Sequence, residues 1–231
     1  MYADLTYKNK SVIKRHSHSR RIEISRELIT TFHCKRILDY GSGDGMIFLG
    51  DYDRFFYAEK ICLFEPFLFE ELLINIKKLG EGRCFEVDRR LPSEKFDMVT
   101  CFEVLEHFED KPLLDRITEI KSIMTKDGVL IISVPIETGI SGLLKNLIRI
   151  FLRQTHPDTT LKNIIKAVIG LKISRKSDSL GYIDSHIGFN YKTLEAQLIK
   201  SGFSIVDSHT SPSRLPILRN FASQKFLVCK R

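Results

Sequence analysis

The residues best suited to chemistry lie in an acidic, glycine-rich turn in the first part of the chain. The turn reads DYGSGDG (39–45) and directly follows an apolar segment. Glycines permit positive φ angles and allow a ligand to approach the backbone closely. Ligands of open α/β sheets bind at the carboxyl ends of strands, which is where this turn falls. Asp39 at its start suits a cationic ligand group and would repel a pyrophosphate.

Glycine spacing separates two classes of adenosine cofactor. The dinucleotide fingerprint GxGxxG would place its third glycine at position 46, but that residue is Met46, and the third glycine is Gly45. Glu65 ends the next apolar segment, where a carboxylate can accept hydrogen bonds from ribose hydroxyls, which NAD also offers. Glu65 therefore indicates an adenosine cofactor, while Asp39 and Gly45 favour one other than NAD.

The segments that must position these residues alternate between apolar runs typical of strands and the 3.6-residue spacing of apolar residues typical of helices. We expect strands at 36–41, 60–66, 83–87, 96–103, 129–135, 203–209 and 225–230. We expect helices at 12–32, 67–79, 112–124 and 191–201. This order predicts an α/β fold with a doubly wound, mostly parallel, Rossmann-like seven-stranded sheet. Because Pro212 and Pro216 disfavour a crossover helix before the last strand, that strand is predicted to be antiparallel.

A single domain (1–231) is expected. Its predicted parts are a helical N-terminal cap (1–34), a cofactor-binding core (35–137), a helical insertion or lid after strand five (138–190), and a C-terminal helix with the final strands (191–231). The chain has 231 residues, of which 43% are hydrophobic and 28% charged, as in ordinary globular proteins. The first residues lack the apolar stretch of a signal peptide, and no apolar run is long enough to cross a membrane, so we expect a cytoplasmic protein.

Neither the cysteines nor the charge identifies a partner. The five cysteines form no CxxC pair and are expected to be reduced packing residues; they are Cys34, Cys62, Cys84, Cys101 and Cys229. No metal site is expected, since His16 and His18 have no supporting ligands. The net charge of +7 gathers at 8–21 and 145–176. It suits nucleic acid, anionic lipid or an anionic small substrate, and equally a solvated surface.

Four blocks of sequence resemble class I S-adenosylmethionine (SAM)-dependent methyltransferases. ILDYGSGDG (37–45) looks like their first motif, and Glu65 matches the acidic residue after their second strand. FDMVTCFEVLEHFED (96–110) is similar to the fourth-strand motif of their small-molecule and glycan-modifying members. KDGVLIISVP (126–135) and HIGFNYKTLEAQLIKSGFSIVDSH (186–209) resemble the fifth strand and the region before the sixth.

The resemblance implies SAM as the cofactor and S-adenosylhomocysteine as its product. Gly41 and Gly43 would line the methionine part of SAM, Asp39 would face its amino group, and Glu65 would hold the ribose. The simpler alternatives are a tight turn for the glycines, a structural hydrogen-bond acceptor or helix cap for Asp39, and an exposed strand-end charge for Glu65.

Further cofactor contacts are implied at the ends of strands two, three and four. Asp88 would contact the adenine amino group, although its neighbours depart from the family pattern and it could equally be a turn residue. Pro66 and Phe67 would pack beside the adenine. Glu103 would lie near the carboxylate or methyl side of the donor.

Methyl transfer from a sulfonium needs alignment more than a protein nucleophile, but an oxygen acceptor requires a base. His107 and His186 are the candidates for catalysis, and Glu106 is a weaker one. For His107 the alternative is a histidine that fixes its loop through backbone hydrogen bonds.

The expected function is methyl transfer to oxygen or nitrogen of a small-molecule or glycan-type acceptor, with an anionic acceptor compatible with the charge. The alternatives are an RNA methyltransferase, a non-catalytic SAM-binding scaffold and an NAD(P)-dependent reductase. DNA is not expected as a partner. The apolar and basic segment 143–153 suits a lid, a homodimer interface or contact with a membrane surface.

Overall fold

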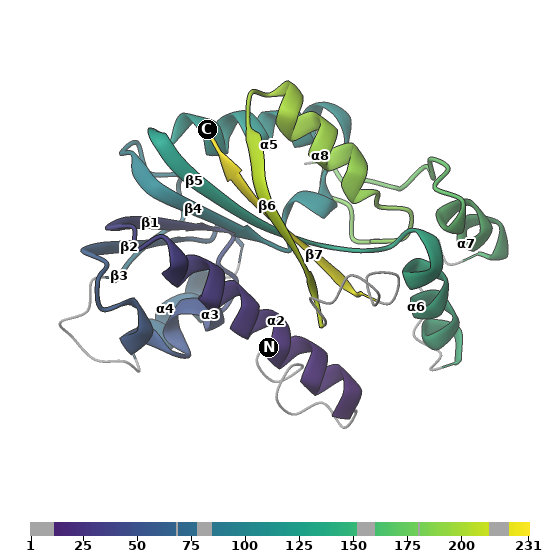
Figure 1. Cartoon of the computed structure of the whole chain (residues 1–231), viewed down its shortest axis with the longest axis horizontal. Coiled ribbons are helices and arrows are strands. Elements are labelled where there is room, and N and C mark those ends of the chain that lie inside the picture. Colours follow the sequence, from purple (N-terminus) through teal and green to yellow (C-terminus); the bar gives the residue numbers. More distant parts are fainter. Residues whose placement is uncertain (1–11, 68, 78–84, 152–159, 180, 213–221) are drawn as a thin grey trace. The chain divides into compact units, whose positions relative to one another are not determined.

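A computed structural model describes residues 12–67, 69–77, 85–151, 160–179, 181–212 and 222–231 (Figure 1). The chain forms two compact units, each described by itself. The first comprises Met1–Phe102, Glu119–Ile132 and Val228–Arg231. The second comprises Glu103–Thr118 and Ser133–Leu227. Cys84 and residues 152–153 of the apolar and basic segment lie outside the described residues.

Seven strands form one sheet in the described part of the chain, in the order β3-β2-β1-β4-β5-β7-β6. They are β1 (Arg36–Tyr40), β2 (Lys60–Phe64), β3 (Phe85–Asp88), β4 (Phe96–Phe102), β5 (Met124–Pro135), β6 (Ser204–Ser211) and β7 (Gln224–Lys230). β1 pairs in parallel with β2 and β4, and β2 pairs in parallel with β3. The predicted Rossmann-like sheet is confirmed.

The direction of β7 follows from its backbone hydrogen bonds to β5. The Arg231 amide, just after β7, donates to Gly128 near the start of β5, over 3.3 Å. The Ile136 amide, just after β5, donates to Ser223, just before β7, over 3.0 Å. The end of each strand therefore meets the start of the other, as in an antiparallel ladder. The prediction of an antiparallel last strand is confirmed.

Helices precede, separate and follow these strands. They are α2 (Val12–Thr31), α3 (Met46–Leu49), α4 (Phe69–Lys77), α5 (Asp110–Ser122), α6 (Gly139–Phe151), α7 (Leu161–Val168) and α8 (Tyr191–Lys200), with 3-10 turns η1 (Tyr52–Phe55) and η2 (Leu105–His107). α2 is the predicted N-terminal helix, and α6 and α7 are the predicted helical insertion after strand five. None of the described helices has the length and apolar character needed to cross a membrane.

Apolar strand residues form the core of the first unit. Strands buried on both faces read as continuous apolar runs, as β1, β2 and β4 do. Their fully buried side chains include Ile37, Leu38, Ile61, Cys62, Leu63, Met98, Val99 and Cys101. This sheet gives the glycine turn after β1 and the carboxylate after β2 rigid points of attachment.

Strand five begins earlier than the sequence analysis predicts. We expected a helix to residue 124 and a strand from residue 129, but α5 ends at Ser122 and β5 begins at Met124. Gly128 lies within the ladder, because its carbonyl accepts the Arg231 amide. Pairing with the last residues of the chain thus extends β5 into the polar residues 125–128, whose local sequence alone does not predict a strand.

Arg26 connects α2 to the short helix that follows the glycine turn. Its guanidinium donates to the carbonyl oxygens of Ile47 over 2.8 Å and Met46 over 2.9 Å, and the residue is buried. A helix as short as α3 offers its carbonyl oxygens few backbone hydrogen-bond donors, and Arg26 supplies additional donors.

We expect Arg26→Met to lower the free energy of unfolding by about 2–4 kcal/mol, since buried hydrogen bonds to a charged group are lost. Arg20→Met provides the control, because Arg20 forms only a half-exposed ion pair with Glu27 on the same helix. It should cost less than about 1 kcal/mol. Urea unfolding followed by circular dichroism measures both, and equal losses in the two variants would contradict this role for Arg26.

Candidate functional site

The glycine turn after β1 is held by the end of β2, within the first unit. The amides of Gly41 and Ser42 both donate to the Phe64 carbonyl oxygen, over 2.9 and 3.1 Å. Gly41 has a φ of 78° and Gly43 a φ of 57°, in the left-handed region that favours glycine. The turn therefore bends sharply at the carboxyl end of the parallel strands, as the sequence predicts.

Gly43 and Gly45 are required for different reasons. A Cβ atom on Gly45 would lie 2.6 Å from Leu49 and 2.7 Å from Leu72, so these side chains would have to shift, and the φ of 75° would strain any residue with a Cβ. A Cβ atom on Gly43 would meet nothing within 4 Å. The position that a Cβ atom would occupy at Gly43 is therefore open, and a ligand can reach the backbone there.

Glu65 connects β2 to the glycine turn. One carboxylate oxygen, Oε2, accepts the Gly43 amide over 2.7 Å, and the other, Oε1, accepts the Phe67 amide over 2.8 Å. The residue is only 5% exposed, so Glu65 is not a free strand-end charge. Each carboxylate oxygen can accept a second hydrogen bond, which leaves capacity for a ligand hydroxyl.

Asp39 is a buried carboxylate on the adjoining strand. Its Oδ1 accepts the Thr100 hydroxyl over 2.6 Å, and Thr100 is its register partner on β4. Burial raises the pKa of Asp39 to about 6, against the lowering effect of the Thr100 hydrogen bond, and the Glu65 carboxylate adds to the rise. A cation beside Asp39 would relieve this cost of burying the charge. Sequence reasoning missed Thr100, which lies inside an apolar strand.

The other cofactor residues expected in the first unit lie on the same strand ends. The backbone carbonyl of Asp88 accepts the Glu65 amide over 3.0 Å, which places Asp88 at the end of β3 beside the end of β2. Pro66 is exposed, and 70% of Phe67 is exposed. The strand register therefore brings Asp39, Glu65 and Asp88 to one edge of the sheet.

Glu103 belongs to the second unit and has a strained backbone. Its φ is 58°, uncommon for a residue with a Cβ. Its amide donates to Ser133 over 3.0 Å, and its carboxylate accepts the side-chain amide of Gln224. The structure thus gives Glu103 a partner on β7 that the sequence analysis did not foresee. Its expected place near the donor stays a prediction.

Glu106, His107 and His186 form a cluster in the second unit. One ligand atom from each, a carboxylate oxygen or a ring nitrogen, lies within 4.8 Å of the others. Glu106 is fully buried, and its Oε1 lies 4.0 Å from Nδ1 of His186, whose side chain is 29% exposed. The fold thus joins two segments far apart in sequence, η2 and the loop before α8. These three side chains are the described residues best suited to hold a metal ion.

His107 is oriented by the loop that carries His186. Its Nδ1 lies 2.7 Å from the Ile183 carbonyl oxygen, and the Ile183 amide donates back to the His107 carbonyl over 2.9 Å. The ring stacks on Tyr182 at 4.5 Å between centroids. Burial lowers the pKa of His107, partly offset by the hydrogen bond to Ile183. A neutral ring with Nδ1 as donor leaves Nε2 as an acceptor. These contacts are the ones expected of a histidine that fixes its loop through backbone hydrogen bonds. They also leave the Nε2 atom able to accept a proton or a hydrogen bond.

Arg175 holds both segments of this cluster and was missed by sequence reasoning. Its Nη1 donates to the carbonyls of Glu106 and Ser185, over 2.9 and 3.0 Å, and its Nε pairs with Glu109 at 2.7 Å. Only 1% of its side chain is exposed. A single arginine in a basic stretch carries no sequence signal of such a role.

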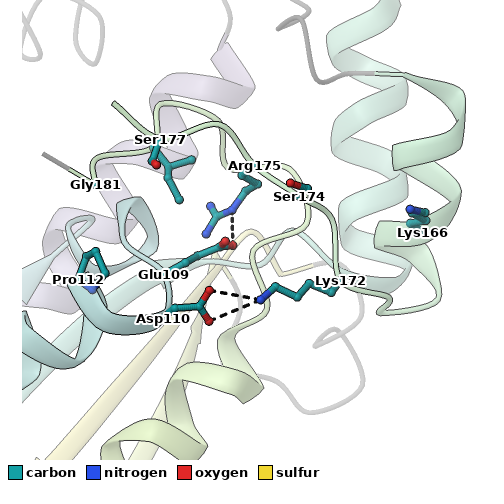
Figure 2. A pocket seen from close by; sticks show the side chains of 10 residues that line it. Glu109, Asp110, Pro112, Lys166, Lys172, Ser174, Arg175, Ser177 and Gly181 are labelled. Carbon is teal, nitrogen blue, oxygen red and sulfur yellow. Dashed lines mark hydrogen bonds and ion pairs between the residues drawn. The ribbon is translucent and has the colours of Figure 1, made fainter. Parts of the chain in front are cut away.

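A pocket of about 620 Å³ adjoins Arg175 within the second unit (Figure 2). Its charged lining residues are Glu109, Asp110, Lys166, Lys172 and Arg175. Figure 2 shows Arg175 directed at Glu109 and Lys172 at Asp110, so the charges in the pocket are largely matched. Neither histidine of the cluster lines this pocket.

Other sequence candidates lie elsewhere. Nδ1 of His18 contacts Arg21 over 3.0 Å on α2. On α6, Leu144 and Leu147 are exposed, and Lys145 pairs with the buried Glu137 over 3.0 Å. A lid, interface or membrane role for 143–153 stays a prediction.

Comparison with solved structures shows the fold. A Nostoc punctiforme protein assigned as an O-methyltransferase has a TM-score of 0.62 at 14% identity; the match covers 93% of this chain and 57% of that one, so this chain spans little more than half its length. Magnesium protoporphyrin IX methyltransferase from Synechocystis, with bound S-adenosylhomocysteine, has a TM-score of 0.58 at 14% identity, covering 96% and 88%. The Burkholderia thailandensis 1,6-didemethyltoxoflavin-N1-methyltransferase has a TM-score of 0.56 at 12% identity, covering 100% and 85%.

Sequence comparison identifies the family. No curated protein matches the chain. A family model described as a methyltransferase domain matches residues 14–168, which include the glycine turn, Glu65 and the η2 segment. The chain therefore belongs to the methyltransferase-domain family.

Proposed function

We propose that this protein transfers a methyl group from SAM to an oxygen or nitrogen atom of a small-molecule or glycan-type acceptor. The observation that carries the proposal is the pair of buried carboxylates, Asp39 and Glu65, on either side of a glycine turn that is open at Gly43. The similar structures from Synechocystis and Burkholderia, which hold S-adenosylhomocysteine, support this choice of donor.

The donor site follows from charge and geometry in the first unit. SAM carries an amino group, a sulfonium and a ribose with two hydroxyls. The Asp39 carboxylate, held by Thr100, meets the amino group, directly or through water. Glu65, whose carboxylate is held by the Gly43 and Phe67 amides, receives the ribose hydroxyls. A pyrophosphate would face two carboxylates here, which disfavours a dinucleotide.

The remaining contacts surround the adenine. Phe67 presents an exposed aromatic ring directly after Glu65, suited to pack on a base. Asp88, at the adjoining strand end, accepts the adenine amino group. Both roles come from the family pattern and from the strand register that places β3 beside β2.

We assign the acceptor side to His107 and His186, with Glu106 behind them. The sulfonium is already a good leaving group, so the protein contributes mainly alignment and exclusion of water. An acceptor hydroxyl must also lose its proton. Nε2 of His107 and the partly exposed ring of His186 are suited to accept it, while a neutral amine acceptor needs no such base.

Glu65→Ala should weaken SAM binding by about 1–3 kcal/mol, because hydrogen bonds to a charged acceptor are lost. Isothermal calorimetry with SAM, S-adenosylhomocysteine and NADH measures the effect. Glu59→Ala, at an exposed carboxylate that pairs with Lys35, is the control and should bind SAM as the unaltered protein does. Unchanged SAM affinity in a folded Glu65→Ala protein would remove Glu65 from the site, and binding of NADH alone would refute the proposed donor.

SAM affinity should fall about tenfold between pH 7 and pH 5. The pKa of Asp39 is raised to about 6 in the unliganded protein, so its carboxyl is mostly ionised at pH 7 and mostly protonated at pH 5. The cationic amino group favours the ionised form, and each pH unit below that pKa costs about a factor of ten. Calorimetric titrations across this range test the sign and the size.

Two controls isolate the Asp39 effect. Asp39→Asn should bind SAM more weakly at pH 7 and lose most of the pH dependence. 5′-Methylthioadenosine, which has the ribose and adenine but no amino group, should bind the unaltered protein with nearly constant affinity from pH 5 to 7. An equally steep fall for this compound would place the titrating group elsewhere.

A further inference from the structure

We propose that Glu106, His107 and His186 bind one divalent transition-metal ion, which holds the acceptor oxygen during methyl transfer. The part concerning the acceptor rests on the proposed function, whereas binding of the ion does not. From the sequence no metal site was expected, since His16 and His18 have no supporting ligands. The three residues proposed here come from two segments that only the fold brings together.

The donor set matches a known class of metal site. Two imidazoles and one carboxylate suit iron(II), manganese, cobalt or zinc, and three protein ligands leave positions open for another oxygen. An ion with bonds of about 2.1 Å holds its ligand atoms about 3–4 Å apart. The three ligand atoms here lie within 4.8 Å of one another. Small side-chain rotations therefore bring them to one ion.

His107 has the surroundings of a metal ligand. Metal-binding histidines usually donate their second ring N–H to a carbonyl or carboxylate, which fixes the tautomer and ring orientation. Nδ1 of His107 makes this contact with the Ile183 carbonyl oxygen at 2.7 Å, and the stacked Tyr182 ring restricts its rotation. Nε2 is then the ligand atom.

Arg175 fixes both segments of the cluster through their backbones. Its guanidinium donates to the backbone carbonyls of Glu106 and Ser185 and pairs with the Glu109 carboxylate. Glu106 itself is fully buried, and a buried carboxylate charge is stabilised by a nearby cation. Nδ1 of His186 lies 4.0 Å from Oε1 of Glu106, so one ion could bind both atoms.

A bound ion would act on the acceptor as a Lewis acid. With the ion bound, His107 and His186 would act as its ligands in place of acting as bases. A hydroxyl coordinated to a divalent ion loses its proton to water more readily, which yields a better nucleophile near neutral pH. The new C–O bond then forms as the C–S bond of the donor breaks, and S-adenosylhomocysteine leaves with the sulfur electron pair. One carboxylate, one divalent ion and one alkoxide or phenolate sum to zero charge, as a partly buried site favours.

The test is cobalt binding to the full chain after dialysis against a chelator. We expect one Co²⁺ per chain and visible absorption bands typical of nitrogen and oxygen ligands. His186→Gln, at a partly exposed ligand, should lower Co²⁺ affinity at least tenfold and change the bands. Glu106→Gln should do the same, and unchanged circular dichroism would show that both variants are folded.

The double variant His16→Ala/His18→Ala is the matched control, because it removes a second histidine pair and leaves the cluster intact. It should bind Co²⁺ as the unaltered protein does. Absence of saturable Co²⁺ binding, or binding that His186→Gln leaves unchanged, would overturn the proposal.

SAM titration of the same samples separates the two proposals. Binding of SAM without any uptake of Co²⁺ would overturn the metal site and leave the methyl-donor site standing. Uptake of Co²⁺ that depends on His186, in a protein without affinity for SAM, would support the metal site and refute the proposed donor.

Discussion

The hydrogen bond from the Gly43 amide to the Glu65 carboxylate joins the two features on which the donor site depends. It holds the glycine turn after β1 against the end of β2, with Glu65 in turn fixed by the Phe67 amide. Parallel pairing of β1 with β2 brings the two groups together, because both strands end at the same end of the sheet. In the proposed donor site, the hydrogen bonds that shape the turn would also hold the Glu65 carboxylate in place for the ribose hydroxyls.

Burial gives the two acidic groups of this edge different characters. Asp39 lies inside the sheet, where loss of solvent raises its pKa to about 6 although the side chains of Thr100 and Ser42 stabilise its charge. Glu65 is held by two backbone amides at the strand end. The Asp39 charge would thus be stabilised by a cation of the ligand, whereas the Glu65 charge is already stabilised by hydrogen-bond donors of the protein. This difference is consistent with a ligand that has a cationic end and a neutral sugar.

The second unit follows another constraint, the cost of a buried carboxylate at Glu106. Arg175 fixes the loop that carries this residue through backbone carbonyls, but directs its charge to Glu109. The histidines at 107 and 186 surround the carboxylate instead. In the proposed function this polar cluster would control the proton of an acceptor hydroxyl, which the sulfonium chemistry itself does not do.

The sequence by itself determined the sheet, its antiparallel last strand, the glycine turn and the family. The spacing of apolar residues, the positions of glycine and proline, and the order of the motifs can all be read locally along the chain. The strand register that unites Asp39, Glu65 and Asp88 was also implicit, since parallel strands end together. Tertiary structure alone decided the rest. Thr100, Gln224 and Arg175 act through partners distant in sequence, β5 extends through KDG because the chain terminus pairs with it, and Glu106 meets His186 only after folding. Such contacts depend on loop closure and side-chain packing, for which a single sequence carries no periodic signal.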